Sequence, residues 1–106
     1  MTLPVEISLL PNQIPASVFA LAGSSAQAFK LAEINRSRKG LMIYNDSVTA
    51  NLLVTFGSRV ASLTNFSFRL LPKQPYELPF PVFQGIVTGI FETAPATGDV
   101  VRVTES

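Results

Sequence analysis

The stretch that decides the fold consists of Leu41-Met42-Ile43-Tyr44, the polar residues Asn45-Asp46-Ser47, and Leu52-Leu53-Val54-Thr55-Phe56. Both apolar runs have the length of an ordinary strand, roughly 3–10 residues, and neither shows the spacing typical of a helix. The first run is apolar on both faces, as in a strand inside a sandwich or beneath a partner. The short side chains of Asn and Asp bond back to their own backbone, so residues 45–47 are predicted to turn. The stretch therefore predicts two buried strands with a polar connection.

Segments with strand character also lie on both sides of this stretch. The clearest is residues 66–70, where Phe66, Phe68 and Leu70 alternate with two polar residues. Residues 26–34 would also accept a helix, but we favour a strand because the rest of the chain lacks a helical period. The predicted strands are residues 3–9, 17–22, 25–34, 41–44, 52–56, 66–70, 85–91 and 100–103.

Proline and glycine mark the connections and special positions. Residues 72–75 contain two prolines and predict a turn, whereas Pro79 and Pro81 flank Phe80 and exclude a central strand there. Gly89 lies within a predicted strand and indicates a bulge or a close backbone approach. Together these features predict an all-β fold: a single antiparallel β-sandwich or jelly-roll-like domain over residues 1–106.

Within this domain, residues 16–106 are predicted to form the sandwich core and residues 1–15 an N-terminal arm. The arm is apolar, so leaving it in water is unfavourable and we expect it to pack. It could pack on its own domain or on a neighbour.

Composition limits the classes of function. Charged residues make up only 14% of the chain, against a usual share of about 25%, which indicates that part of the surface is covered by partners. The net charge of +1 provides no long-range attraction to nucleic acid or to an anionic membrane. The sequence lacks a basic leader, and no apolar run approaches the roughly 18 residues of a membrane helix. We expect a soluble protein made in the cytoplasm.

The chain contains neither Cys nor His. Disulfides, thiolate nucleophiles and Cys-ligated metals are therefore excluded, and so is the commonest general base and metal ligand. Glu77 and Glu92 are the best candidates for a glycosidase-type carboxylate pair, but each is better explained as an acceptor for turn amides or as an outer-face residue. We predict that the protein is not an enzyme and holds no metal or cofactor.

Two groups of side chains are candidates for binding. Arg36, Arg38 and Lys39 form a basic cluster, which fits either a solvated turn or contact with an acidic partner, since a nucleic-acid patch would need interleaved aromatic residues. Tyr44, Tyr76, Phe80 and Phe83 could form a sugar platform. The chain has eight Phe, two Tyr and no Trp, and sugar platforms favour Tyr and Trp, so we favour core and protomer-interface roles.

The order of the motifs resembles a known pattern. An Asn/Arg-containing segment leads into Gly-Leu-x-Ile-x-Asn, a strand ends in Phe-Gly, a Leu-Pro turn is followed by Tyr-Glu-Leu, and a Gly-x-Val strand pair comes last. Here these are residues 35–45, 56–57, 70–78 and 85–90. The pattern is similar to that of small β-sandwich virion proteins of tailed bacteriophages, of the capsid decoration (cement) type. Residues 1–30 lie outside the resemblance.

The resemblance implies a structural virion protein. It would be a capsid decoration (cement) protein that binds the outer surface of a phage capsid and stabilises contacts between major capsid protein subunits. It would form a homo-oligomer, with a trimer favoured, and would be located in the virion after synthesis in the host cytoplasm. Under this hypothesis the capsid contacts are Leu3, Val5, Ile7, Leu9, Arg36, Arg38 and Lys39, and the protomer contacts are Tyr76, Phe80, Pro81 and Phe83. The alternative is a receptor- or glycan-binding module of a phage tail or head fibre.

Overall fold

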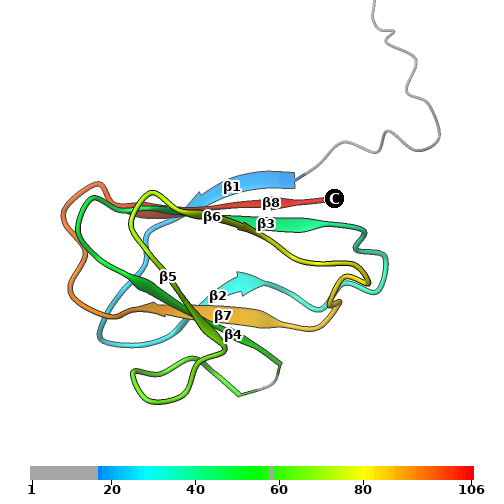
Figure 1. Cartoon of the computed structure of the whole chain (residues 1–106), viewed down its shortest axis with the longest axis horizontal. Coiled ribbons are helices and arrows are strands. Elements are labelled where there is room, and N and C mark those ends of the chain that lie inside the picture. The colour runs from blue at the N-terminus through cyan, green and yellow to red at the C-terminus, as the bar shows by residue number, and fades with distance from the viewer. Residues whose placement is uncertain (1–16, 58) are drawn as a thin grey trace, which may run out of the picture.

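The computed structural model of the chain describes residues 17–57 and 59–106. These residues form two four-stranded antiparallel sheets and no helix, which confirms the predicted all-β sandwich. Figure 1 shows the two sheets as layers facing each other. The strands are β1 (Ser17–Leu21), β2 (Phe29–Ala32), β3 (Leu41–Asp46), β4 (Leu52–Phe56), β5 (Phe68–Leu70), β6 (Pro75–Glu77), β7 (Val87–Phe91) and β8 (Val100–Glu105).

The strand order identifies the topology as a jelly roll. One sheet has the order β1-β8-β3-β6 and the other β2-β7-β4-β5. The first four strands therefore pair with the last four in reverse sequence: β1 with β8, β2 with β7, β3 with β6 and β4 with β5, all antiparallel. Such a doubled-back hairpin wrapped into two sheets is the jelly-roll arrangement. The structure thus selects the second of the two predicted topologies.

The core lies between the sheets and is filled by the residues that face inward along the strands of both sheets. In β3 the exposed Met42 separates the buried Leu41 and Ile43, which is the period of two expected for a strand with one covered face. At Gly89 two side chains, and no second backbone, approach closely: a Cβ built there would lie 3.1 Å from Leu31 Cδ1 and 3.3 Å from Leu52 Cδ1. The main core comprises Leu31, Ala32, Leu41, Ile43, Ala50, Leu52, Val54, Leu70, Leu78, Val87, Phe91, Val101 and Val103.

A smaller apolar cluster covers the outer face of the second sheet. Ala61 and Phe66, from the connection between β4 and β5, pack over Leu53 and Ile90. The amide of Ala61 donates to Thr88 Oγ1 at 3.0 Å, which ties this connection to β7. Because both faces of β7 are covered, all five of its residues are buried.

Several predicted boundaries differ from the structure. β3 continues through Asp46, so the predicted turn over residues 45–47 begins only at Ser47. The reason is that Asn45 and Asp46 still pair with Val101 and Val100 of β8. The buried side chain of Asn45 donates to the carbonyls of Ala50, in the connection after β3, and of Leu70, at the end of β5. The predicted turn over residues 72–75 overlaps β6, which begins at Pro75, because a proline at the start of a strand resembles the corner of a turn. The helical alternative for residues 26–34 is wrong, since β2 is a strand with a register shift opposite β7. The predicted strand at residues 3–9 and the arm at 1–15 lie outside the described residues.

The connections gather at the two ends of the sandwich. One end, which we call the Arg38 end, comprises residues 33–40, residues 78–86 and Ser106, joined by backbone hydrogen bonds such as Asn35 N to Gln84 O. The opposite end, the Asp46 end, comprises residues 22–28, 47–51, 71–74 and 92–99, joined likewise by bonds such as Phe91 N to Ser24 O and Lys73 N to Asn45 O. Figure 1 shows the C-terminus at the first of these ends.

Candidate functional site

A buried arginine organises the Arg38 end. Arg38 is only 2% exposed, and its Nε donates a hydrogen bond to Glu105 Oε2 at 2.6 Å. One terminal nitrogen donates to the carbonyls of Phe83 and Gly85 at 2.7 and 3.0 Å, and the other to the carbonyl of Glu33 at 2.5 Å. The guanidinium fork therefore joins three separate segments of the chain, a task that suits its planar set of donors.

The capsid contact assigned to Arg38 stays a prediction, and the structure gives this side chain an internal role. Its guanidinium points into the protein and binds Glu105, so its charge is already paired. The sequence offered no sign of this, because Glu105 and Phe83 lie 67 and 45 positions away along the chain. The pairing of Leu41 with Glu105 in the sheet brings Glu105 close. The bonds of Leu78 N to Leu41 O and of Asn35 N to Gln84 O bring in the segment that holds Phe83.

Further hydrogen bonds hold the same segments. The Gln84 side chain donates to the carbonyl of Arg38 at 3.2 Å, while the amide of Asn35 donates to the carbonyl of Gln84 at 2.8 Å. The backbone of Ser106 pairs with residues 39–40: it accepts from Lys39 N at 2.7 Å and donates to Gly40 O at 3.0 Å. The loops at this end are thus cross-linked to each other and to β8.

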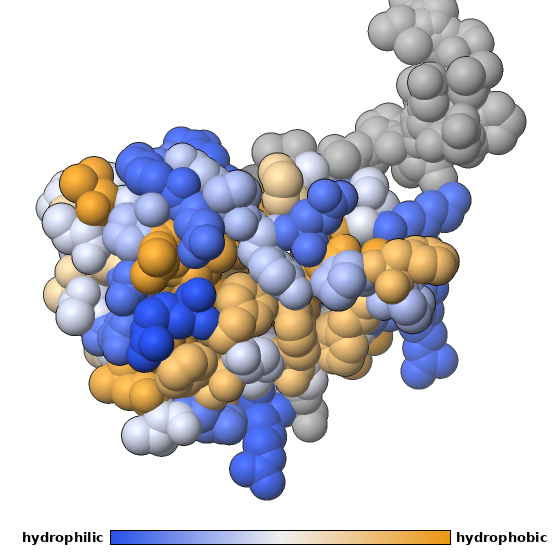
Figure 2. Space-filling model, viewed as in Figure 1, coloured by the Kyte–Doolittle hydropathy of each residue, from blue (hydrophilic) through white to orange (hydrophobic). Residues whose placement is uncertain are grey.

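On this scaffold lies an exposed apolar patch. Phe80 is 91% exposed, the most exposed of the large apolar side chains. It borders a pocket of about 500 Å³ whose remaining lining is Arg38, Lys39, Pro81, Val82 and Gln84. We call Lys39, Phe80, Pro81, Val82 and Gln84 the end patch. Figure 2 shows apolar residues gathered on the side of the molecule between the two sheets and continuing toward the end of the sandwich.

A row of aromatic rings leads along that side to the patch. Tyr76 packs on Phe68 with ring centroids 4.4 Å apart, Phe68 on Phe56 at 5.7 Å, and Phe56 on Phe83 at 5.4 Å. The row closes the opening between the edge strands β6 and β5, and it fixes Phe83, which is 38% exposed. Tyr76 is half-buried in it.

The structure brings together residues that the prediction assigned to two kinds of contact. Lys39, predicted for a capsid contact, lines one pocket with Phe80 and Pro81, which were predicted for a protomer contact. Arg36 is exposed in the same 33–40 segment. Val82 and Gln84 were not predicted, and only the fold shows that they belong with Lys39. Leu3, Val5, Ile7 and Leu9 lie outside the described residues.

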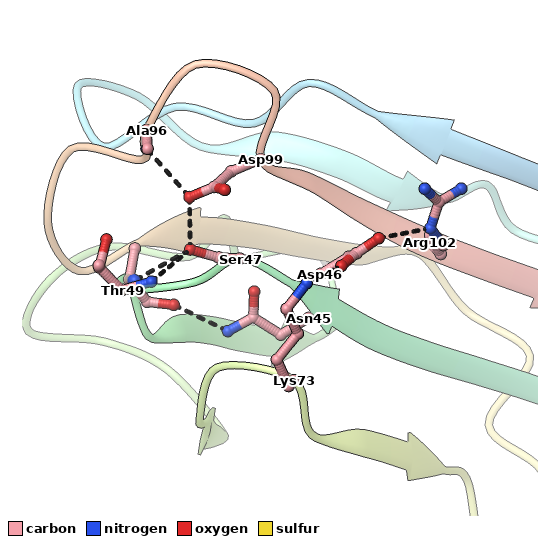
Figure 3. A network of polar contacts seen from close by, with 9 residues as sticks. Asn45, Asp46, Ser47, Thr49, Lys73, Ala96, Asp99 and Arg102 are labelled. Atoms are coloured by element: carbon pink, nitrogen blue, oxygen red, sulfur yellow. Dashed lines mark hydrogen bonds and ion pairs between the residues drawn. The ribbon is translucent and has the colours of Figure 1, made fainter.

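A polar network occupies the Asp46 end (Figure 3). Asp46 accepts hydrogen bonds from Lys73 Nζ and, at 2.7 Å, from Arg102 Nε. The bond from Lys73 makes the larger contribution, and the two together hold the pKa of Asp46 below its usual value. Asp99 accepts from Ser47 Oγ at 2.6 Å, which lowers the pKa of Asp99. Ser47 Oγ also accepts from the amide of Ala50. These carboxylates are engaged in holding the loops of this end together.

The two glutamates considered for catalysis are not brought together. Glu77 pairs with Met42 near the Arg38 end of β3, whereas the amide of Glu92 bonds to Asn51 at the Asp46 end, in the other sheet. The carboxylate of Glu92 accepts a hydrogen bond from Arg69 Nε at 2.9 Å, and this bond lowers the pKa of Glu92.

Two further observations concern residues 17–57 and 59–106 only. Among them, no three Asp, Glu, His or Cys side chains are grouped so that they could hold a metal ion. The same part of the chain contains no helix long and apolar enough to cross a membrane.

Comparison with known proteins adds no further information. No protein-family model, curated protein or solved structure matches this chain.

Proposed function

We propose that the chain is a structural protein of a phage virion, a capsid decoration (cement) protein that binds major capsid protein subunits on the outer surface of the shell. The observation that carries the proposal is the end patch, in which an almost fully exposed Phe80 is presented by loops that Arg38 fixes in place. An exposed aromatic side chain is unfavourable in water and is typical of a protein contact.

The rigidity of the end patch supports this function. Arg38 bonds to the carbonyls on both sides of Gln84, so little order has to be created when a partner binds. Presenting an anchor in its bound conformation lowers the entropic cost of association. Each contact can then be small, since many copies on one shell act together.

The charge of the patch indicates the chemistry of the partner. Lys39 and Arg36 are exposed cations beside the apolar residues, which is the arrangement of an apolar contact with a polar rim. A capsid surface that exposes carboxylates around an apolar depression would fit it. Arg38 contributes by positioning the loops.

The direct test is to locate the protein on the particle. Gold-labelled antibody against the chain, applied to intact particles of the phage that encodes it, is expected to decorate the head. A head that carries no label would contradict the proposal, and label confined to tail or head fibres would favour the alternative.

An add-back experiment tests the surface. Capsids from a phage lacking the gene are mixed with the wild-type protein, Phe80→Ser or Leu71→Ser. Leu71 is 50% exposed at the opposite, Asp46 end and serves as the matched control. Removing a central aromatic anchor is expected to weaken binding about 30-fold, as for a contact of roughly 2 kcal/mol. Equal affinities for Phe80→Ser and the wild type would exclude the end patch as the contact.

A receptor- or glycan-binding module is the second candidate, and the pocket itself favours it. An exposed aromatic ring beside the Gln84 amide and the Lys39 ammonium offers a face for a sugar ring and donors for its hydroxyls, and jelly rolls also occur in lectins. A glycan array decides this: reproducible binding that Phe80→Ser abolishes, without capsid affinity, would replace the first proposal.

A further inference from the structure

We propose that the outer edge of β1 takes up an extended segment of a major capsid protein subunit as an additional strand of the sheet. This inference rests on the proposed function, because it concerns how the same partner is held. Three observations carry it. The outer edge of β1 lacks the features that protect the other sheet edges, the backbone groups of two of its residues point away from the sheet, and the edge begins close to the end patch.

The described residues contain four edge strands, and three of them carry features that hinder the addition of a strand. β2 has the exposed Lys30 and a register shift between Lys30 and Ala32. β5 and β6 have three residues each, with the exposed Arg69 in β5 and Pro75 at the start of β6. Charged side chains, prolines, bulges and short length are the means by which proteins keep sheet edges from pairing.

β1 has none of these features. It is five residues long, pairs with β8 in an unbroken register, and contains no charged residue and no proline. It forms one edge of its sheet, and no other described strand pairs on its outer side (Figure 1). An edge of this kind is a template for another strand, and strand addition is a common way for a sheet to bind an extended segment of a partner.

The register shows which backbone groups of β1 are available. Gly40 and Ser106 exchange backbone hydrogen bonds at 3.1 and 3.0 Å. Because the bonding direction alternates along a strand, the even-numbered residues of β8 bond to β3 and the odd-numbered ones bond to β1. The residues of β1 opposite the odd-numbered ones are Ser17, Phe19 and Leu21. The N–H and C=O groups of Val18 and Ala20 therefore point away from β8, where a further strand would bond to them.

The position of the edge indicates the occupant. Ser17 pairs with Glu105, and the backbone of the next residue, Ser106, bonds to Lys39 of the end patch. Since neighbouring strands lie about 4.8 Å apart, the β1 edge begins roughly 10 Å from the backbone of Lys39, with β8 between them. A capsid subunit bound at the end patch would thus have the β1 edge within reach of the same contact.

The surroundings of β1 define the chemistry of the added segment. Residues 17–29 contain no charged side chain, so this edge offers no charge to pair with one in the partner. Leu21 packs against the main core, so a side chain of the added strand next to Leu21 would extend that core. The segment is therefore expected to be uncharged where it pairs and to carry apolar residues at alternate positions.

Ala20→Pro tests the edge in the add-back experiment, on capsids from a phage lacking the gene. Proline removes the outward N–H of residue 20 but none of the hydrogen bonds between β1 and β8, and edge strands tolerate proline at such positions. The variant is expected to bind at least about 10-fold more weakly than the wild type, since one backbone hydrogen bond is lost and the ring obstructs the added strand. Ala20→Ser keeps the N–H, serves as the matched control and should bind like the wild type.

Equal binding by Ala20→Pro and the wild type would overturn the inference and leave the proposed function standing. An equal loss in Ala20→Ser would also overturn it, because the side chain and not the backbone would then make the contact. A wild-type chain that does not bind capsids would remove the proposed function and this inference together.

Hydrogen exchange at single amides of the wild-type chain identifies the occupant without any variant. In the free chain the amides of Val18 and Ala20 are expected to exchange rapidly and those of Phe19 and Leu21 slowly, and on the capsid all of them should exchange slowly. Slow exchange of Val18 and Ala20 in the free chain would overturn the inference. It would assign the edge to the same chain if light scattering gives 11.4 kDa, and to a second copy if the mass is a multiple. Rapid exchange that persists on the capsid would overturn it as well.

Discussion

Replacing Arg38 by methionine is expected to lower the free energy of unfolding by about 3 kcal/mol. Breaking a buried ion pair by removing one partner typically costs about 3–5 kcal/mol. We take the lower limit because the side chain of Glu105 keeps 18% of its exposure, so water can solvate the orphaned carboxylate. Methionine fills the volume, but it leaves the carbonyls of Phe83, Gly85 and Glu33 without their donor.

Urea unfolding followed by far-ultraviolet circular dichroism measures this change in the free energy of unfolding. In a thermal melt followed by the same signal, the melting temperature should fall by about 12 °C or more, since each kcal/mol corresponds to roughly 4–8 °C in a domain of this size. Arg38→Lys keeps the charge but not the fork, and we expect it to lose about half as much. Amide hydrogen exchange should rise first in residues 78–86, which hold the end patch.

A mutant cycle with Glu105→Gln separates the ion pair from general disruption. If the pair acts as described, Glu105→Gln should cost about 1 kcal/mol or less once Arg38 is gone, and clearly more in the wild type. The control is Lys39→Met, an exposed neighbour for which about 0.5 kcal/mol or less is expected. A loss below about 1 kcal/mol for Arg38→Met, or fully additive effects with Glu105→Gln, would refute the reasoning.

Three other predictions concern the core and the Asp46 end. Gly89→Ala is expected to cost about 1–2 kcal/mol by overpacking, because its Cβ would lie 3.1 Å from Leu31 Cδ1; equal unfolding midpoints in urea would contradict this. Asn45→Ala should cost about 2 kcal/mol, since it removes the donors to two buried carbonyls, and calorimetry would detect the lower melting temperature. The folded pKa of Asp46 is lowered, so the stability it confers is present above its unfolded pKa and is lost as pH falls through the folded value. Thermal melts from pH 6 to 2 should therefore show a shallower acid decline in Asp46→Asn, and an unchanged slope would contradict the assignment.

The parts of the fold that were predictable are those with local causes. Which face of a strand is covered can be inferred from neighbouring residues. This holds for the alternation in residues 66–70 and for the apolar runs at 41–44 and 52–56. β6 was missed because three residues beginning with a proline look like a corner. Pro75 is tolerated there since β6 is an edge strand among the described residues, and no other described strand pairs on its outer side.

The site was predictable only in part, because its geometry depends on contacts between residues far apart in the sequence. Phe80 and Lys39 were recognised as candidates from their residue types, but their common pocket depends on how residues 33–40 and 78–86 meet. Arg38 looked like one more exposed cation, because its partners Glu105 and Phe83 are set by the jelly-roll pairing of early with late strands. No periodicity in the sequence reports that pairing.

The bonding of Ser106 to residues 39–40 has a practical consequence for anyone who wishes to use this domain as a carrier. A peptide fused after Ser106 would emerge beside Phe80 and compete with whatever binds there. Residues 93–94 and 96–98 are exposed at the far end of the sandwich. Cargo inserted among them would point away from the end patch, so a displayed epitope and a working contact surface could coexist on one small domain.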